Sequence, residues 1–162
     1  MTDNQNNNLN DKLEWKINSF QQLNNSLLYE IIKLRIDVFV VEQNCPYAEL
    51  DNKDDHPETI HITATLNSEL VAYARIVPPE LSYTEVSMGR FIVKQPFRRQ
   101  GIGSELLTKC LAEKFRIWPN YKIKISAQEH LKPYYEYFGF RVVSDIYLED
   151  GIPHVEMLKD PP

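Results

Sequence analysis

One segment constrains this chain most strongly: Met88-Gly89-Arg90-Phe91-Ile92-Val93-Lys94-Gln95-Pro96-Phe97-Arg98-Arg99-Gln100-Gly101-Ile102-Gly103. Its first half reads as a strand, Pro96 marks a turn, and an amphipathic helix begins after Gly101. Glycines let a backbone approach a ligand closely. The first turn of a helix presents unpaired N–H groups at the positive end of the helix dipole. The segment therefore predicts an anion site suited to a pyrophosphate.

Spacing separates this loop from two other kinds of phosphate-binding loop. No Lys follows Gly103, as a Walker A loop requires. Leu106 stands where a dinucleotide-binding fingerprint carries its third glycine. The pattern that remains is Arg98-x-x-Gly101-x-Gly103, which by itself also fits an ordinary glycine-rich helix start.

Length and composition indicate one folded domain. The chain has 162 residues, of which 43% are hydrophobic. Residues 1–11 are polar and rich in Asn, so we expect a tail there and a single domain over 12–162. No apolar run is long enough to span a membrane and no signal-peptide pattern opens the chain, which predicts a cytoplasmic protein. Neither the two cysteines nor the four histidines have metal-ligand spacing, so we expect no metal.

The negative charge is concentrated in one segment. Residues 42–58 hold six acids and one base, Lys53, which accounts for the whole net charge of −5. A nucleic-acid partner is disfavoured because such proteins present a basic face. The segment is either a solvated loop or a surface that attracts a cationic substrate.

Hydrophobic periodicity predicts the remaining elements. Alternation predicts strands at 14–17, 60–66, 70–76, 84–94, 122–127, 140–148 and 152–158, and a three-to-four-residue period predicts helices at 21–40, 102–118 and 131–138. The polar connection over 43–57 has a length typical of functional loops. A strand–helix–strand order across 84–127 implies a right-handed crossover and a parallel pair.

Together, this element order and the glycine loop resemble the GNAT acyltransferases, whose acetyl-CoA loop reads Gln/Arg-x-x-Gly-x-Gly/Ala. Tyr134-Tyr135-Glu136-Tyr137-Phe138-Gly139-Phe140 is similar to that family's aromatic-Tyr-x-x-x-Gly-Phe signature. Residues 34–43, Cys45-Pro46-Tyr47 and residues 149–154 resemble its ElaA-type subgroup. The resemblance implies an α/β fold with a mixed central sheet of about six to seven strands and helices on both faces. That sheet combines an antiparallel meander with a splayed parallel pair at the acetyl-CoA site.

The resemblance also implies a donor site. The main chain of Phe91, Ile92 and Val93 should pair with pantetheine, and Gln128 should contact it. The pyrophosphate should lie on the backbone of Arg99, Gln100, Gly101, Ile102, Gly103 and Ser104, with added charge from Arg98 or Arg99.

Tyr135 is the side chain that the family signature assigns to proton donation at the departing thiolate, although aromatic packing is an alternative role. The general base stays open. Many family members carry Glu on the fourth strand, near Gly89-Arg90 of this chain. Glu85 and His61 are our main candidates, followed by Glu42 and His154. A small amine of modest pKa could also react without a dedicated base.

The function implied is transfer of an acetyl group from acetyl-CoA to a primary amine of a small molecule or peptide by direct attack. A cationic acceptor is expected if the acidic segment borders the acceptor side. The alternatives are a non-catalytic acyl-CoA-binding or regulatory module, and an interaction domain that does not bind acetyl-CoA. We expect no nucleic-acid or membrane partner, and either a monomer or a homodimer.

Overall fold

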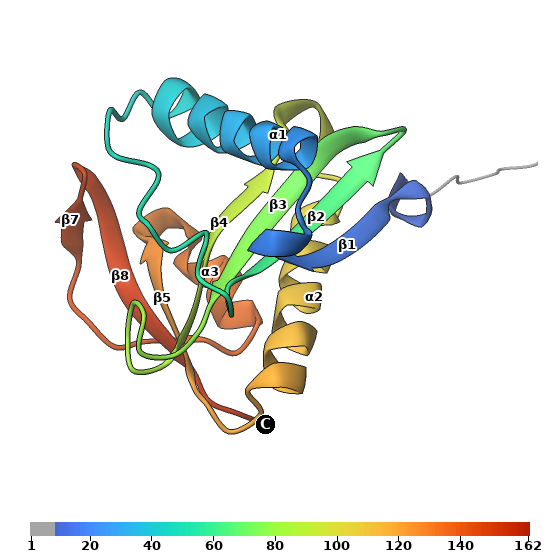
Figure 1. Ribbon diagram of the computed structural model, residues 1–162. Coiled ribbons are helices and arrows are strands. Elements are labelled where there is room, and N and C mark those ends of the chain that lie inside the picture. The colour runs from blue at the N-terminus through green and yellow to red at the C-terminus, as the bar shows by residue number, and fades with distance from the viewer. Residues whose placement is uncertain (1–8) are drawn as a thin grey trace, which may run out of the picture.

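A computed structural model of the protein describes residues 9–162 (Figure 1). One eight-stranded sheet has the order β1-β2-β3-β4-β5-β8-β6, with β7 also paired to β8. Only β4 and β5 run parallel; the other pairs are antiparallel. The bounds are β1 (Glu14–Ser19), β2 (Ile60–Leu66), β3 (Glu69–Val77), β4 (Val86–Val93), β5 (Ile123–Gln128), β6 (Arg141–Val142), β7 (Tyr147–Glu149) and β8 (Ile152–Lys159). The predicted meander and parallel pair are confirmed.

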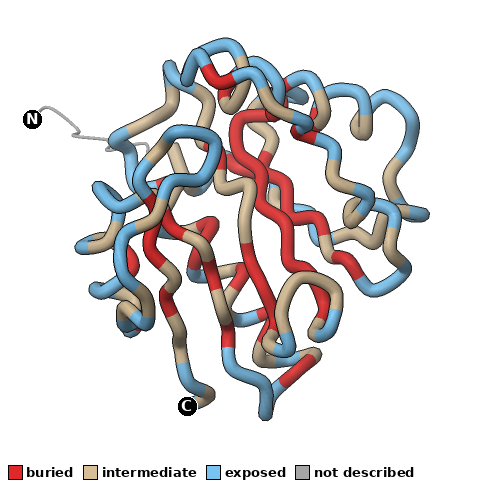
Figure 2. Tube along the Cα trace, turned by 90° about the vertical axis from the view of Figure 1, so that its left-hand side faces the viewer, coloured by how far each residue is buried: buried red, intermediate tan, exposed pale blue. Residues whose placement is uncertain are grey.

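Helices cover both faces of the sheet, as expected (Figure 1). On one face, α1 (Asn25–Arg35) continues into the π-helix η3 (Ile36–Glu42). Ile31, Leu34 and Val38 of this unit share a core with Tyr73 and Ile92 of the sheet. On the other face, α2 (Ile102–Ile117) and α3 (Lys132–Tyr137) enclose the larger core. The buried residues follow the central strands between these layers (Figure 2).

The first helix begins later than the sequence predicts. Its expected start was Gln21, but Phe20–Gln22 form the short helix η2, and α1 begins only at Asn25. Asn24 precedes it in an extended conformation, and its side-chain oxygen accepts a bond from Leu27 N at 2.8 Å. This N-cap satisfies an N–H group that the first turn leaves unpaired, and so fixes the start of the helix.

The strand predicted over 140–148 divides into β6 and β7, so the sheet has eight strands. Ser144 lies between the two pieces. Its hydroxyl donates to Asp145 O and accepts from Glu156 N, each at 2.8 Å. A side chain that bonds the backbone locally competes with the strand ladder. The interruption leaves β7 and β8 as a hairpin at one end of the sheet.

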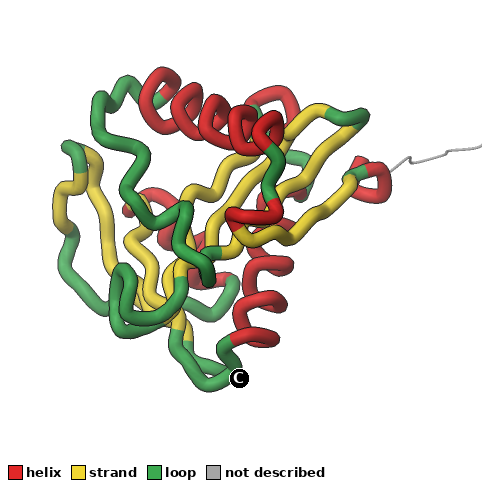
Figure 3. Tube along the Cα trace, in the orientation of Figure 1, coloured by secondary structure: helices red, strands yellow, loops and turns green. Residues whose placement is uncertain are grey.

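The N-terminal residues and the long connection complete the chain. Residues 9–11, assigned to the polar tail, lie in the short helix η1 (Leu9–Lys12), and Leu9 packs against the core. The tail's residues 1–8 fall outside the described part. Residues 43–59 contain no helix or strand and run across the sheet face as a loop (Figure 3). Over residues 9–162, no helix has the length and apolar character needed to cross a membrane.

Candidate active site

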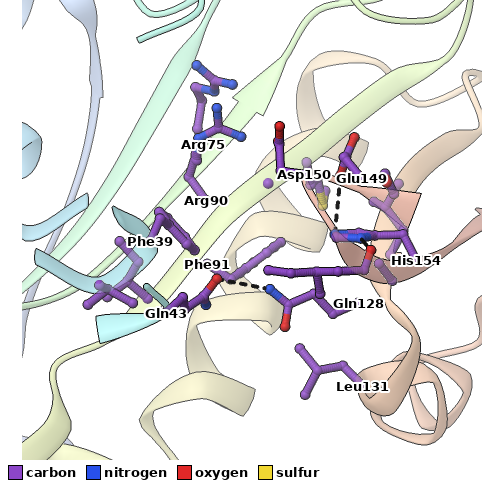
Figure 4. A pocket seen from close by; sticks show the side chains of 18 of the residues that line it. Phe39, Gln43, Arg75, Arg90, Phe91, Gln128, Leu131, Glu149, Asp150 and His154 are labelled. Atoms are coloured by element: carbon purple, nitrogen blue, oxygen red, sulfur yellow. Dashed lines mark hydrogen bonds and ion pairs between the residues drawn. The ribbon is translucent and has the colours of Figure 1, made fainter. Parts of the chain in front are cut away.

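The site begins where β4 and β5 separate. These strands pair at Val86 with Ile123 and at Ser87 with Lys124, and the register ends there. Beyond that point Arg90 has a φ of 56°, and the β3–β4 register shifts by a bulge. A bulge bends its strand, and β4 therefore turns away from β5. The resulting cleft has a volume of about 990 Å³, and Phe91, Ile92 and Val93 line it, as Figure 4 shows in part.

The glycine loop places free N–H groups beside this cleft. Gly101 is the N-cap of α2 with a φ of 82°, a left-handed conformation that favours glycine. The first hydrogen bond of the helix runs from Glu105 N to Gly101 O at 3.1 Å. The N–H groups of Ile102, Gly103 and Ser104 precede this bond, so they have no intrahelical acceptor. The loop has the backbone geometry of an anion site.

The two loop arginines have different surroundings. The Arg98 Nε donates to Val93 O at 2.7 Å, and its two terminal nitrogens contact Glu42 at 2.6 and 3.0 Å. The bond from Arg98 lowers the pKa of Glu42. The Arg99 side chain is exposed and has no ion-pair partner among residues 9–162. Both residues line the cleft, but Arg99 is the one whose charge is uncompensated.

Tyr135 projects from α3 into the aromatic floor of the cleft. It is 7% exposed and packs edge-on against Phe91, Tyr134 and Phe140 at centroid distances of 6.3, 5.3 and 5.7 Å. Burial raises the pKa of its phenol, which is therefore protonated at neutral pH. Within the described chain its hydroxyl has no hydrogen-bond partner. The neighbouring Tyr134 hydroxyl donates to Gly103 O at 3.0 Å and ties α3 to the glycine loop.

Gln128 spans the mouth of the cleft. It ends β5, and its Nε2 donates to Gln43 Oε1, just after η3, at 3.3 Å (Figure 4). Gln128 also lines the cleft, together with Leu131 at the start of α3. Gln128, the side chain expected to contact pantetheine, therefore lies on the β5 wall of the cleft, and Phe91 lies on the β4 wall.

Two of the base candidates lie away from this cleft. Glu85 precedes β4, at the end opposite the glycine loop, and its carboxylate accepts from Thr84 Oγ1 at 3.0 Å. His61 is buried on β2, with Nδ1 2.8 Å from the Tyr73 hydroxyl and Nε2 2.9 Å from Asp54 O. Burial lowers the pKa of His61. Neither residue lines the cleft, so the structure does not bring them to Tyr135.

Sequence reasoning missed a network of three arginines and three carboxylates beside the bulge. Its members come from α1, β3, β4 and the long loop: Arg35, Arg75, Arg90, Glu49, Asp51 and Asp54. Arg35 binds both oxygens of Glu49 at 3.0 and 2.6 Å, and Arg90 Nε contacts the same carboxylate at 2.7 Å. The sequence signal for this network is an arginine at a position that the hydrophobic pattern predicts to be buried, as for Arg35 in α1 and Arg75 in β3.

Most acids of the segment over 42–58 are paired with arginines instead of being free to attract a cation. Three of its six acids are paired with these arginines, and Glu42 is paired with Arg98. Burial would raise the pKa of Asp51, but the bond from Arg75 brings it down to about 2. Four of the six acids are therefore paired with arginines, and much of the charge expected to attract a cation is used internally.

The opposite wall of the cleft is the β7–β8 hairpin (Figure 4). Glu149, at the end of β7, contacts His154 of β8 and Ser126 of β5, in each case at 3.2 Å. Ser126 Oγ lies 2.5 Å from the Tyr147 hydroxyl. Glu149, Ser126 and His154 all line the cleft. Of the four base candidates, only Glu42 and His154 lie there, and Glu42 is ion-paired.

Comparisons with known proteins agree with this architecture. Residues 28–161 match the acetyltransferase (GNAT) domain family. Protein ElaA of Escherichia coli strain K12 is 40% identical over 148 residues, covering 91% of this chain and 97% of that protein. Its crystal structure superposes with a TM-score of 0.87.

A second solved structure is equally similar. It is an acyl-CoA N-acyltransferase from Pseudomonas aeruginosa, with 38% identity, a TM-score of 0.87, and coverage of 91% of this chain and 99% of that one. The cleft between β4 and β5, the glycine loop and these matches agree with one another. The chain therefore belongs to the GNAT family of acyltransferases, in its ElaA-type subgroup.

Proposed function

We propose that the protein is an N-acetyltransferase that moves the acetyl group of acetyl-CoA to a primary amine of a small molecule or peptide. The observation that carries the proposal is the cleft between β4 and β5. It is bordered by a helix N-terminus that has no side-chain cap and by a buried phenol without a hydrogen-bond partner in residues 9–162. The first feature suits a pyrophosphate, and the second suits a leaving thiolate.

In this proposal the donor lies along the opened edge of β4. Pantetheine pairs with the main chain of Phe91, Ile92 and Val93 and contacts Gln128. The pyrophosphate binds the backbone from Arg99 to Ser104. Arg99 supplies the positive charge, because the charge of Arg98 is already compensated by Glu42.

The transfer itself is a single displacement. The amine nitrogen attacks the thioester carbon, the C–S bond breaks, and its electron pair leaves on sulfur. Tyr135 donates its proton to that sulfur and regains one from the nitrogen as the amide forms. The raised pKa of the phenol keeps the proton in place until negative charge develops on the sulfur.

A second candidate is a non-catalytic acyl-CoA-binding module. Arg90 favours it, because this residue stands near the position where many family members carry a catalytic Glu, and its guanidinium is bound to Glu49. The two functions share the donor site and differ only in acceptor chemistry.

One experiment separates these functions. The purified chain is mixed with acetyl-CoA and, in turn, putrescine, phenethylamine or an alanyl-lysine amide, and release of the CoA thiol is followed. Amine-dependent thiol release supports the acetyltransferase. A melting-temperature shift with CoA but no thiol release from any amine supports the binding module, and no shift at all contradicts both.

A further inference from the structure

We propose that Glu149 is the carboxylate that receives the acceptor's amino group and takes its proton, and that Ser126, Tyr147 and His154 are positioning residues for it. This inference rests on the acetyltransferase function proposed above. It assigns the acceptor subsite to the β7–β8 hairpin rather than to the acidic loop over 42–58.

Both side-chain contacts of the Glu149 carboxylate involve the same oxygen, Oε2. Oε2 accepts from Ser126 Oγ at 3.2 Å and lies 3.2 Å from His154 Nε2. Because the Ser126 proton is directed to Glu149, the Tyr147 hydroxyl donates to Ser126 Oγ across 2.5 Å. The chain from Tyr147 through Ser126 fixes the orientation of the carboxylate.

The second oxygen of Glu149 is left for a ligand. Oε1 has no hydrogen-bond partner among residues 9–162, and the side chain is 50% exposed on a residue that lines the cleft. A carboxylate held through one oxygen and open at the other matches an ammonium group, which has only donors. The site therefore offers an oriented acceptor atom on the wall opposite Arg90.

His154 cannot itself serve as the base in this arrangement. Its Nδ1 lies 2.7 Å from Ile152 O, and its Nε2 faces Glu149. Both ring nitrogens thus face acceptor groups within the protein, so neither is left to accept a proton from the substrate. The imidazole holds Glu149 in place, and the carboxylate makes the contact with the amine.

The other cleft acids are less suited to the role. Glu42 is bound by Arg98, and Asp51 is bound by Arg75 and Arg90. Asp150 lies next to Glu149 at the hairpin turn, but its carboxylate has no hydrogen bond within residues 9–162 that would orient it. Glu149 alone combines an open oxygen with a fixed position.

The proton balance is complete without a further reactant. The bound ammonium passes one proton to Glu149, which later releases it to solvent. The neutral nitrogen attacks the thioester carbon and the C–S bond breaks. The second nitrogen proton reaches the sulfur by way of Tyr135. The products are the N-acetyl amine, free CoA and one released proton.

The test replaces one oxygen of the carboxylate. Glu149→Gln keeps the size and the bonds from Ser126, but it removes the charge and the basicity. We expect kcat/KM for putrescine to fall roughly 10²–10⁴-fold while the affinity for CoA, measured by calorimetry, is unchanged. Glu156→Gln is the matched control: Glu156 lies on β8 outside the cleft and is paired with Lys124 at 3.0 Å, so activity should stay at the wild-type level.

A double-mutant cycle tests the positioning role. Ser126→Ala should lower kcat about tenfold, and Ser126→Thr, which keeps the hydroxyl, should restore it. In the Glu149→Gln background Ser126→Ala should have little further effect, because Ser126 acts through Glu149.

Three results overturn the inference. Wild-type kcat/KM in a folded Glu149→Gln variant overturns it while leaving the acetyltransferase function intact. Equal losses from Ser126→Ala in both backgrounds remove the positioning role. Absence of thiol release by the wild-type protein with every amine overturns the proposed function, and this inference with it.

Discussion

Arg98, at the start of the glycine loop, forms a two-pronged ion pair with Glu42, the last residue of η3, through N–O distances of 2.6 and 3.0 Å. The pair joins the two segments that border the donor side of the cleft. Because it is partly exposed, it adds little to stability. Its consequence is electrostatic: it compensates Arg98 and leaves Arg99 as the loop cation available to a phosphate.

We therefore expect Arg99→Gln to weaken CoA binding. A charge-assisted hydrogen bond contributes about 1.5–3 kcal/mol, which corresponds to a loss of at least about tenfold in affinity. The loss should shrink at high salt, where exposed charges are screened. Calorimetric titration of CoA at two salt concentrations measures both effects. Arg116→Gln, at the far end of α2, is the control; an equal loss there would point to net charge alone.

Gly101→Asp should abolish CoA binding in a protein that still folds. The substitution brings a carboxylate to the anion site and forces an L residue into a φ of 82°. Gly101→Ala separates the two effects, since it carries the backbone strain of about 1–2 kcal/mol without the charge. Melting temperatures report the strain, and titration with CoA reports the site. Unchanged CoA affinity in the Asp variant contradicts the assignment of the pyrophosphate.

Tyr135→Phe removes only the hydroxyl from a buried ring. Turnover should fall roughly 10²–10⁴-fold, the usual contribution of a positioned proton donor. CoA affinity should change little, because the ring and its contacts with Phe91 and Phe140 remain. Steady-state kinetics measure the effect. Tyr137→Phe, whose side chain is 86% exposed, is the matched control. Equal turnover in the two variants would assign Tyr135 to packing.

Glu49→Gln should destabilise the protein strongly. Arg35 is 1% exposed, and Glu49 binds it through both carboxylate oxygens, whereas Asp54 contributes only one. Breaking a buried pair by removing one partner costs about 3–5 kcal/mol. Urea unfolding followed by circular dichroism gives the change in the free energy of unfolding. Glu58→Gln on the exposed part of the same loop should stay near the wild-type value.

His61 should make stability depend on pH below about 6.5, the ordinary pKa of the imidazole. Its folded-state pKa lies below the ordinary value of 6.5, so the unfolded chain takes up a proton first as the pH falls. Its contribution is thus full above pH 6.5 and is lost below it. The pKa of Asp51 is lowered from 3.8 to about 2, so this residue affects stability only at a lower pH. The difference in melting temperature between the wild type and His61→Gln should shrink as the pH is lowered from 7.5 to 5. Parallel curves would exclude His61 as the cause.

The features that the sequence predicted correctly are those that depend on residues close together in the chain. The turn at Pro96, the helix that begins after Gly101 and the apolar period of α2 depend on near neighbours in the chain, and each is confirmed. The antiparallel meander followed from strict alternation in β2 and β3. The start of α1 and the break between β6 and β7 were wrong, since single side-chain bonds from Asn24 and Ser144 fix those boundaries.

Sequence alone determined the family and most of the element order, because motif spacing and hydrophobic periodicity are local properties of the chain. Only the tertiary structure decided the partners. Arg90 meets Glu49 across 41 positions of the chain, and Ser126 meets Glu149 across 23. Periodicity states that a residue is buried or faces a cleft, but it does not state which distant charge lies beside it. That depends on strand order and on the bulge at Arg90. The same packing left Glu149 open and compensated most of the acids that the sequence had suggested for the acceptor.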